Sequence, residues 1–568
     1  MLDTERKGIV MSKKVKLSAA AFILLISTNL TTKAQIFDLE GIRASDIDPS
    51  GAYKSFSFFT QQHKPQASGE TGHQNIPAVP LPTAISVPLQ PAAYNFWGRK
   101  FEGSPIPGVG TSGLLPVTRG HLALLTSGEE AFSARLKTLQ NARRSIRIQA
   151  LIFTADESGM AVAKILKEKH KQGLDVRVIV DAFSNLITSK KKLDLATQFM
   201  YYDLKQNGIE VEGYEALLLQ WLNEISFHDP RQPDKRLHDK MWIIDAEDPA
   251  SASAVVGGMN IANEYFRMGN DAGHRWRDQD FLVTGEVVND ITTVFERNYA
   301  EQKKIKHSRP GLWNTDRVWE LWRKYIVMNF GMYTPPAFKP DEAIQGRVNA
   351  IMRGASDYTP ELLPAKMRFL QSRPRVKETY ILQAYEDLCA SARKELLIVN
   401  AYFIPTPRIL AAIKGAARRG VAVTIITNPP ATNDLPEMSY ASRYTYHGLL
   451  AVNHETGTRN QSGSIRIAEW AGHKFSEGTM HAKFAVSDRK YVIGGSYNLD
   501  PRSESLNSET VIEFENETLA ARLAENVAKR DLPKCEVITK EQAAAFHNPK
   551  KAPDILKLLL WNGLRGEL

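Results

Sequence analysis

The sequence predicts an α/β protein built from two tandem, pseudo-symmetric lobes. Three observations support this fold class. From about His121, segments with helical and strand-like apolar patterns alternate regularly. Residues 132–183 match residues 380–430 in their order of elements, and the same short His-x-Lys motif follows each of these two stretches.

The chain is expected to begin with an export signal at residues 1–34. Lysines within residues 13–16 precede an apolar run from Leu17 to about Leu30, and a small-residue cleavage site follows at Ala34. The run is short and interrupted by Ser and Thr, which favours a cleaved signal over an uncleaved membrane anchor. We therefore expect an exported protein, periplasmic or secreted, that works at a membrane surface.

The repeat sets the remaining boundaries. Residues 35–118 scatter Pro, Gly, Ser and Gln without a sustained period, which predicts an irregular, Pro-rich and partly disordered extension. The expected units after it are a first lobe at 119–310, a connecting helical segment at 311–375, a second lobe at 376–535 and a C-terminal amphipathic tail at 536–568.

Each copy of the repeat reads helix, strand, helix, strand, and a shorter strand follows. The expected strands are residues 145–153, 175–181, 209–214, 395–403, 421–427 and 465–470. The second helix of each copy is expected to close at Gly173 or Gly420, because glycine readily adopts the left-handed conformation found at helix ends. Two such units related by a pseudo-twofold axis would bring matching residues to their interface.

A His-x-Lys-x4-Asp motif, followed by Gly-Gly-x-Asn or Gly-Ser-x-Asn, occurs at corresponding positions of the two halves. Its members are His238, Lys240, Asp245, Gly257, Gly258 and Asn260 in the first half, and His481, Lys483, Asp488, Gly495, Ser496 and Asn498 in the second. One match to so short a pattern is weak evidence. Two matches within an independently detected repeat indicate one shared functional site.

The residue types in this motif suit a phosphodiester substrate. In extended backbone, side chains two residues apart point the same way, so the His and Lys of each motif project together. Lysine ammonium and asparagine amide groups can hold the non-bridging oxygens and stabilise charge that develops on phosphorus. One neutral imidazole can attack phosphorus, and the other, protonated, can donate its proton to the leaving alkoxide and then activate water or an alcohol.

Each of the two histidines needs a partner on its other ring nitrogen to set its tautomer and orientation. The expected partners are Asp278 and Glu509, which stand downstream of the two motifs at similar positions, and Asp280 competes with Asp278 for this role. Asp245 and Asp488 are expected to bind neighbouring backbone rather than to take part in chemistry. No metal-ligand spacing or Gly-rich nucleotide loop accompanies these motifs, so neither a metal nor another cofactor is expected.

With these residues in place, the chain resembles the phospholipase D superfamily, whose signature HxKx4Dx6GSxN occurs twice. The second copy matches from His481 to Asn498. The first copy departs from the signature, because residues 246–256 lengthen the Asp-to-Gly spacing from six to eleven residues and Gly258 stands in place of Ser. The additional residues are rich in Pro, Ala and Ser, which predicts an elongated hairpin turn that leaves the flanking strands intact.

The resemblance covers about residues 120–530, and the stretches 428–453 and 494–509 are most similar to bacterial cardiolipin synthases of the C type. It implies two phospholipase D-like α/β/α sandwich lobes with the active site at their interface, a phosphohistidine intermediate and no metal requirement. It also implies that one motif histidine is the nucleophile and the other the general acid. We favour His238 as the nucleophile.

Charge and composition leave several functions open. The formal charge of +9 suits an acidic phospholipid, a nucleic acid or a phosphorylated small molecule, and equally an ordinary basic surface. The favoured function is a monomeric, exported enzyme that transfers a phosphatidyl group to a histidine and then to water or to an alcohol such as phosphatidylglycerol. The alternative is an exported, metal-independent endonuclease. A binding module without activity is disfavoured, because both motifs keep their His and Lys.

Overall fold

The computed structural model describes residues 95–98, 117–181, 184–185, 194–214, 236–308, 338–374, 378–454 and 464–547. The expected export signal, nearly all of the Pro-rich extension and the end of the expected C-terminal tail lie outside these residues. Within the described part of the chain, no helix is both long and apolar enough to cross a membrane.

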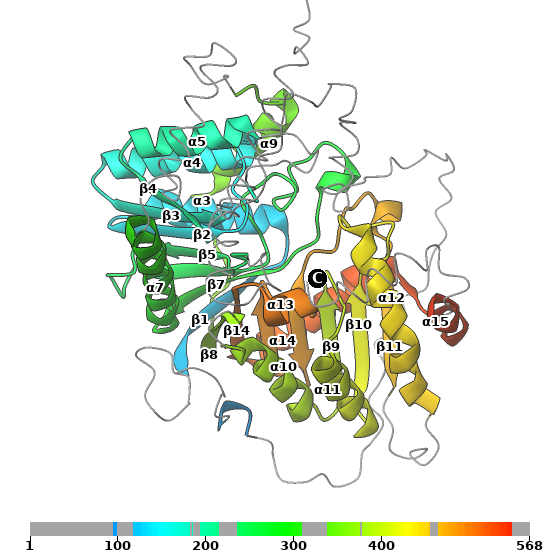
Figure 1. Cartoon of the computed structure of the whole chain (residues 1–568). Coiled ribbons are helices and arrows are strands. Elements are labelled where there is room, and N and C mark those ends of the chain that lie inside the picture. The colour runs from blue at the N-terminus through cyan, green and yellow to red at the C-terminus, as the bar shows by residue number, and fades with distance from the viewer. Residues whose placement is uncertain are drawn as a thin grey trace, which may run out of the picture.

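The strands of both halves join into one sheet (Figure 1). The strands are β1 (Thr118–Leu125), β2 (Ser145–Ala150), β3 (Asp175–Asp181), β4 (Glu210–Tyr214), β5 (Met241–Ile244), β6 (Ser253–Gly257), β7 (Asp280–Gly285), β8 (Leu363–Ser372), β9 (Glu395–Asn400), β10 (Ala422–Thr427), β11 (Ile465–Trp470), β12 (Lys483–Ser487), β13 (Tyr491–Gly495), β14 (Glu509–Glu515) and β15 (Cys535–Val537).

Strand order in this sheet repeats between the two halves. It reads β4-β3-β2-β5-β6-β7-β1 in the first half and β11-β10-β9-β12-β13-β14-β8 in the second, with β15 added at the outer edge of β11. The last strands of the two series, β1 and β8, pair antiparallel, with Thr118 opposite Met367 and Leu122 opposite Leu363. The predicted pseudo-twofold relation is confirmed, and its axis passes between these two strands.

Helices cover both faces of the sheet (Figure 1). They are α3 (Gly128–Asn141), α4 (Glu157–Lys171), α5 (Leu195–Gln206), α7 (Val287–Ser308), α9 (Glu342–Gly354), α10 (Tyr380–Ser391), α11 (Pro407–Arg418), α12 (Pro436–Leu450), α13 (Pro501–Ser505), α14 (Glu517–Asn526) and α15 (Lys540–His547). One face carries α3, α4 and α5 over the first half and α10, α11 and α12 over the second, each set with its own apolar core. The opposite face carries α7 and α14 over a core that both halves share. This arrangement confirms the predicted fold class of two α/β/α lobes.

Residues at the helix ends explain where several of these helices begin and end. Ser127 and Asp156 cap the N-termini of α3 and α4 by accepting hydrogen bonds from backbone N–H groups of the first turn. Gly173 has φ +94° and Gly420 has φ +97°, so both glycines close their helices in the left-handed region, as predicted.

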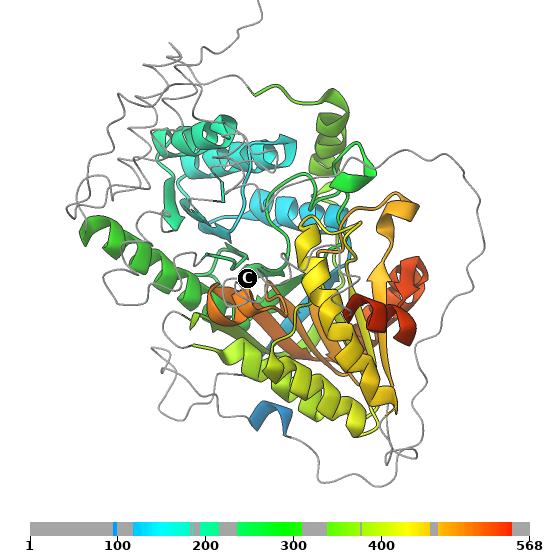
Figure 2. The same cartoon turned by 45° about the vertical axis from the view of Figure 1, so that its right-hand side comes forward.

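Two predicted segments differ from the structure. The connecting segment, predicted to be helical, contains strand β8, and the start of the predicted tail contains β15 and α15. Strand β8 escaped prediction because its centre carries Arg368, which is fully buried and pairs with Glu513 at 2.6 Å. This ion pair places charge where a central strand is expected to be apolar. Helix α15 packs beside α12, with Phe546 and Tyr446 in ring contact (Figure 2).

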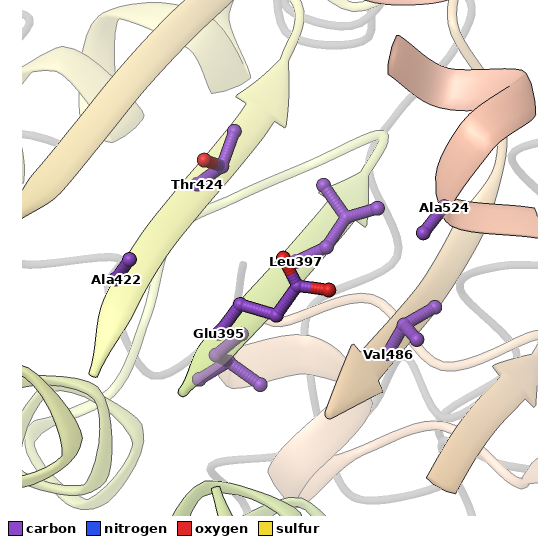
Figure 3. A pocket seen from close by; sticks show the side chains of 7 residues that line it. Glu395, Leu397, Ala422, Thr424, Val486 and Ala524 are labelled. Carbon is purple, nitrogen blue, oxygen red and sulfur yellow. The ribbon is translucent and has the colours of Figure 1, made fainter. Parts of the chain in front are cut away.

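A small pocket lies between β9, β10, β12 and α14 (Figure 3). Its lining includes Glu395, Leu397, Thr424 and Val486, and contains none of the residues of either His-x-Lys motif. It is a packing gap under α14 rather than a candidate site.

Candidate active site

The two motifs occupy equivalent positions in two β-hairpins, β5–β6 and β12–β13. Met241 pairs with Val256, and Phe484 pairs with Gly494. In both hairpins the residue after the motif lysine therefore faces the residue before the motif glycine. The longer first turn, around residues 246–252, lies beyond the paired strands, so the insertion leaves the register of the site unchanged.

Asp245 and Asp488 anchor these hairpins to the rest of the sheet. Both residues have φ +52°, which turns the chain at the end of the strand. Their carboxylates accept backbone N–H bonds from Arg143, Arg144 and Ser145 in the first half and from Arg393, Lys394 and Glu395 in the second. Both aspartates thus bind neighbouring backbone, away from the motif histidines.

Replacing either aspartate is expected to destabilise the fold. Asp488→Ala removes three hydrogen bonds to a carboxylate, which we expect to cost about 3 kcal/mol in the free energy of unfolding. The melting temperature of Asp488→Ala and of Asp245→Ala, set against the exposed control Asp357→Ala, measures this effect. A melting temperature equal to that of the control would contradict the anchoring role.

Each motif histidine is bound by a carboxylate from the other half of the chain. Nδ1 of His238 lies 2.7 Å and 2.9 Å from the two carboxylate oxygens of Glu509. Nδ1 of His481 lies 2.6 Å from Oδ2 of Asp278. With Nδ1 engaged, Nε2 of each imidazole is the nitrogen available for chemistry. Both carboxylates were predicted from the sequence, but their exchange between the halves was not.

Asp280, the competing partner, has a different role. It forms a buried ion pair with Arg135 at 2.5 Å, and its Oδ1 accepts a hydrogen bond from the backbone N–H of Met259. The side chain therefore ties α3 to the segment that follows β6, and its bonds to Arg135 and Met259 do not involve His481.

Backbone hydrogen bonds hold each histidine against the partner segment. The N–H of His238 donates to the carbonyl of Ser508 at 2.9 Å, and the N–H of His481 donates to the carbonyl of Arg277 at 2.7 Å. Ser508 and Arg277 immediately precede the two carboxylate residues Glu509 and Asp278. The site is therefore assembled from both halves at the level of the main chain.

Burial dominates the electrostatics of the first dyad. It lowers the pKa of His238 to about 4, assisted by Lys240 and opposed by Glu509. It also lowers the pKa of Lys240 to about 7 and that of Lys483 to about 8. Burial would raise the pKa of Glu509, but the neighbouring His238 and Lys240 outweigh it, and the pKa is lowered. When the imidazole is neutral, its Nδ1–H hydrogen bond and the charge of Lys240 still favour the ionised form of Glu509.

The second dyad differs in its carboxylate. Burial lowers the pKa of His481 well below its ordinary value and raises the pKa of Asp278, against the opposing charge of Lys483. Both effects disfavour charge in this pair, and the imidazole of His481 is neutral in the empty site.

Three aromatic residues around His481 were not predicted as part of the site. The ring centroids of Tyr265 and Trp276 each lie 5.1 Å from that of His481, and the ring of Tyr402 lies 6.3 Å away. For Tyr265 and Trp276 the available signal was their proximity in sequence to Asn260 and Asp278, and Tyr402 offered no such signal. They enclose His481 on sides that the carboxylate leaves uncovered.

The two motif asparagines are placed differently. Asn260 Oδ1 accepts a hydrogen bond from the N–H of Ile152 at 3.1 Å, and its Nδ2 donates to the hydroxyl of Tyr265 at 2.9 Å. Asn498 is 4% exposed, and its Oδ1 has no hydrogen-bond partner among the described residues. Both polar atoms of the Asn260 side chain are thus hydrogen-bonded, whereas in the described part of the chain the side-chain oxygen of Asn498 is not.

Two differences between the halves are linked. The first half has Gly258 where the second half has Ser496, and it has Asp278 where the second half has Glu509. In the second half, Ser496 Oγ donates to Glu509 Oε2 at 2.5 Å. In the first half, a Cβ placed on Gly258 would lie 2.6 Å from Oδ1 of Asp278, which is closer than atoms can pack. The shorter Asp278 brings its carboxylate nearer the backbone than Glu509 does, and Gly258 provides the space.

Gly258→Ser is accordingly expected to lower kcat by about 10²-fold, because it displaces the carboxylate that orients His481. Gly346→Ser is the matched control, since a Cβ there meets no atom within 4 Å. Steady-state kinetics on both variants, with melting temperatures alongside, tests the expectation. Normal kcat in a folded Gly258→Ser protein would show that the close approach is unimportant.

An α/β protein with two pseudo-symmetric halves, whose paired His-x-Lys motifs meet at one interface, has the architecture of the phospholipase D superfamily. The family model described as "Cardiolipin synthase, PLD-like domain" matches residues 136–299 and 385–531. The chain belongs to this family, as the sequence motifs predicted.

Several proteins are similar to the chain. A cardiolipin synthase of Geobacillus kaustophilus is 27% identical over 391 residues, which cover 68% of this chain and 61% of that protein. A probable cardiolipin synthase of Bacillus subtilis is 25% identical over 423 residues, covering 74% of this chain and 68% of its own length. The structure of a phosphatidylserine synthase from Haemophilus influenzae aligns with a TM-score of 0.52 and 16% identity, over 78% of this chain and 93% of that one. The match to the first of these relatives thus spans about three-fifths of that relative's length.

Proposed function

We propose that the protein is a phospholipid phosphodiesterase and phosphatidyltransferase that works through a phosphohistidine intermediate. The observation that carries this proposal is the pair of exchanged dyads: two neutral imidazoles, each fixed through Nδ1 by a carboxylate of the other half, with two buried lysines beside them. Membership of the cardiolipin synthase family supports a phospholipid as the substrate.

The first step transfers the phosphatidyl group to the enzyme. Binding of the phosphodiester anion first brings a proton to Nε2 of His481, which is neutral in the empty site. Nε2 of His238 then attacks phosphorus, the bond from phosphorus to the headgroup oxygen breaks, and Nε2 of His481 gives that proton to the departing alkoxide. Lys240 and Lys483 hold the non-bridging oxygens.

The second step releases the phosphatidyl group. His481, now neutral, takes the proton of water or of an alcohol, whose oxygen attacks phosphorus while the bond to His238 breaks. Water gives phosphatidic acid, and phosphatidylglycerol as the alcohol gives cardiolipin. Both histidines return to their starting protonation states.

The surroundings of Glu509 support His238 as the nucleophile. Glu509 accepts hydrogen bonds from Ser496 at 2.5 Å and from Ser503 at 2.8 Å. Its lowered pKa keeps it anionic, and an anion on Nδ1 stabilises the positive charge that the imidazole acquires as its bond to phosphorus forms. Asp278, whose pKa burial raises, suits a histidine that returns to neutrality.

Substrate binding at pH 7 is expected to take up about one proton, because a phosphodiester anion raises the pKa of nearby imidazoles that burial keeps neutral in the empty site. Titration calorimetry of a phosphonate analogue in buffers of different ionisation enthalpy measures the number of protons. His481→Ala is expected to take up none. An unchanged uptake in that variant would assign the proton to another group.

Product analysis tests the proposed reaction. Purified protein is incubated in EDTA with phosphatidylethanolamine and phosphatidylglycerol, with and without ethanol, and the lipids are measured by mass spectrometry. Phosphatidic acid, cardiolipin or phosphatidylethanol is the expected product, and their ratio separates hydrolysis from transfer. No lipid product, with cleavage of DNA in a parallel EDTA tube, would overturn the proposal in favour of the endonuclease.

We also propose that the protein is exported and acts as a monomer at a membrane surface. The signal-like segment at residues 1–34 supports export. The two halves of one chain supply both dyads, so a second copy is not needed to complete the site. Cell fractionation with N-terminal sequencing, and light scattering of the purified protein, test these two points.

A further inference from the structure

The first motif contains a buried carboxyl group that the proposed chemistry does not use. Asp239 stands between His238 and Lys240 and is 0% exposed, whereas the second motif has Ala482 at this position. Its Oδ2 accepts three hydrogen bonds, and its Oδ1 has no partner among the described residues. A carboxyl group buried in this way destabilises a fold unless its contacts compensate.

The three donors to Asp239 come from both halves of the chain. Ser508 Oγ donates at 2.6 Å, and the amide nitrogens of Gln149 and Gln371 donate at 3.0 Å each. Gln149 lies on β2, while Gln371 lies on β8 and Ser508 leads into β14. Asp239 therefore connects the first motif to the strands on either side of the pseudo-twofold axis.

The contact with Ser508 reaches the first dyad directly. The carbonyl of Ser508 accepts the N–H of His238 at 2.9 Å, and the N–H of Ser508 donates to the carbonyl of Arg236 at 3.0 Å. Ser508 precedes Glu509, and Asp239 follows His238. One side-chain bond thus joins the residues next to both members of the dyad.

The second dyad is braced at the corresponding place by a different pair. Arg277, which precedes Asp278, forms a buried ion pair with Asp531 at 3.0 Å and 2.9 Å. Arg277 is 2% exposed and Asp531 is 1% exposed. Because Arg277 obtains its carboxylate from the segment after α14, the second motif needs none of its own and has Ala482 instead. Each dyad therefore has a buried carboxyl group next to it, Asp239 for the first and Asp531 for the second. These two residues do not occupy corresponding positions in the two halves.

We propose that Asp239 is a positioning residue that, by binding Ser508, holds Glu509 in line with His238. The inference rests on the proposed phosphatidyl transfer, because its effect is on the orientation of the nucleophile. Asp239 is fully buried and its hydrogen bonds go to side chains of the protein, so its expected contribution lies in the turnover step and not in substrate binding.

The test compares Asp239→Ala, Asp239→Asn and Ser508→Ala in steady-state transfer from phosphatidylethanolamine to ethanol. Asp239→Ala and Ser508→Ala are each expected to lower kcat by about 10²-fold with KM unchanged, since a small misplacement of a reacting group has an effect of that size. The double variant is expected to lose no more than either single variant. Asp239→Asn keeps an acceptor oxygen for Ser508 and is expected to retain most of the wild-type kcat.

Ser391→Ala is the matched control, because Ser391 is a buried serine that binds the carbonyl of Leu388, away from both dyads. Absence of both phosphatidic acid and phosphatidylethanol with the wild-type protein would overturn the proposed function itself. Transfer by the wild type together with normal kcat in Ser508→Ala, or with additive losses in the double variant, would overturn the role of Asp239. Equal losses in Asp239→Asn and Asp239→Ala would also overturn it, since the asparagine preserves the proposed bond. If Asp239→Ala fails to fold, Ser508→Ala and Asp239→Asn still decide the question.

Discussion

His238→Ala and His481→Ala are each expected to lower kcat for phosphatidyl transfer by at least about 10⁴-fold, the loss typical of removing a nucleophile or its acid–base partner. The two histidines act as one unit, so the double variant is expected to be no less active than either single variant. Product formation from phosphatidylethanolamine, followed by mass spectrometry with internal standards, covers this range.

His274→Ala is the control for these substitutions. Nδ1 of His274 lies 2.7 Å from Asp271, which copies the dyad geometry at an exposed position. Its activity is expected to equal that of the wild-type protein. Retained turnover in both His238→Ala and His481→Ala would rule out the two-histidine mechanism.

Glu509→Gln and Asp278→Asn are expected to lower kcat by about 10³-fold with a natural headgroup, because each amide replaces the anion that orients and charges an imidazole. The two variants should differ with a phosphatidyl ester of p-nitrophenol, a leaving group that needs no proton. Asp278→Asn is expected to release one nitrophenol per enzyme rapidly and then turn over slowly. Glu509→Gln is expected to lose the rapid phase, since we propose that its carboxylate supports the nucleophile His238.

Stopped-flow absorbance measures both phases, and Asp271→Asn provides a matched control at the exposed pair. The exchanged dyads make this a strict test, because Asp278 lies in the same half as His238 but serves His481. A rapid phase lost in Asp278→Asn and kept in Glu509→Gln would reverse the roles of the two histidines.

Much of this site could be predicted from the sequence because each short motif, which is weak evidence alone, recurs at the corresponding position of an internal repeat. The strands at residues 145–150 and 422–427, the helix ends at Gly173 and Gly420 and both histidine partners were all expected from local patterns. The strands and helix ends depend on residues close together in the chain, and the two histidine partners were expected from their similar positions downstream of the motifs.

The features that escaped prediction depend on contacts between distant segments. The exchange of Glu509 and Asp278 follows from the pairing of β1 with β8, and the strand β8 was hidden by its buried Arg368. The positions of Tyr265 and Trp276 beside His481 likewise require the two halves to be docked. Local pattern contains no information on such contacts, since the same residues would suit an ordinary core.

The most direct test of the central claim is identification of the covalent intermediate. His481→Ala protein is mixed with the nitrophenyl phosphatidyl ester, quenched in base to preserve a phosphorus–nitrogen bond, digested and analysed by peptide mass spectrometry. We expect one phosphatidyl group on His238, because the proposed nucleophile remains and the proposed base for the second step is gone. A phosphatidyl group at any other residue, or none while nitrophenol is released, would contradict it.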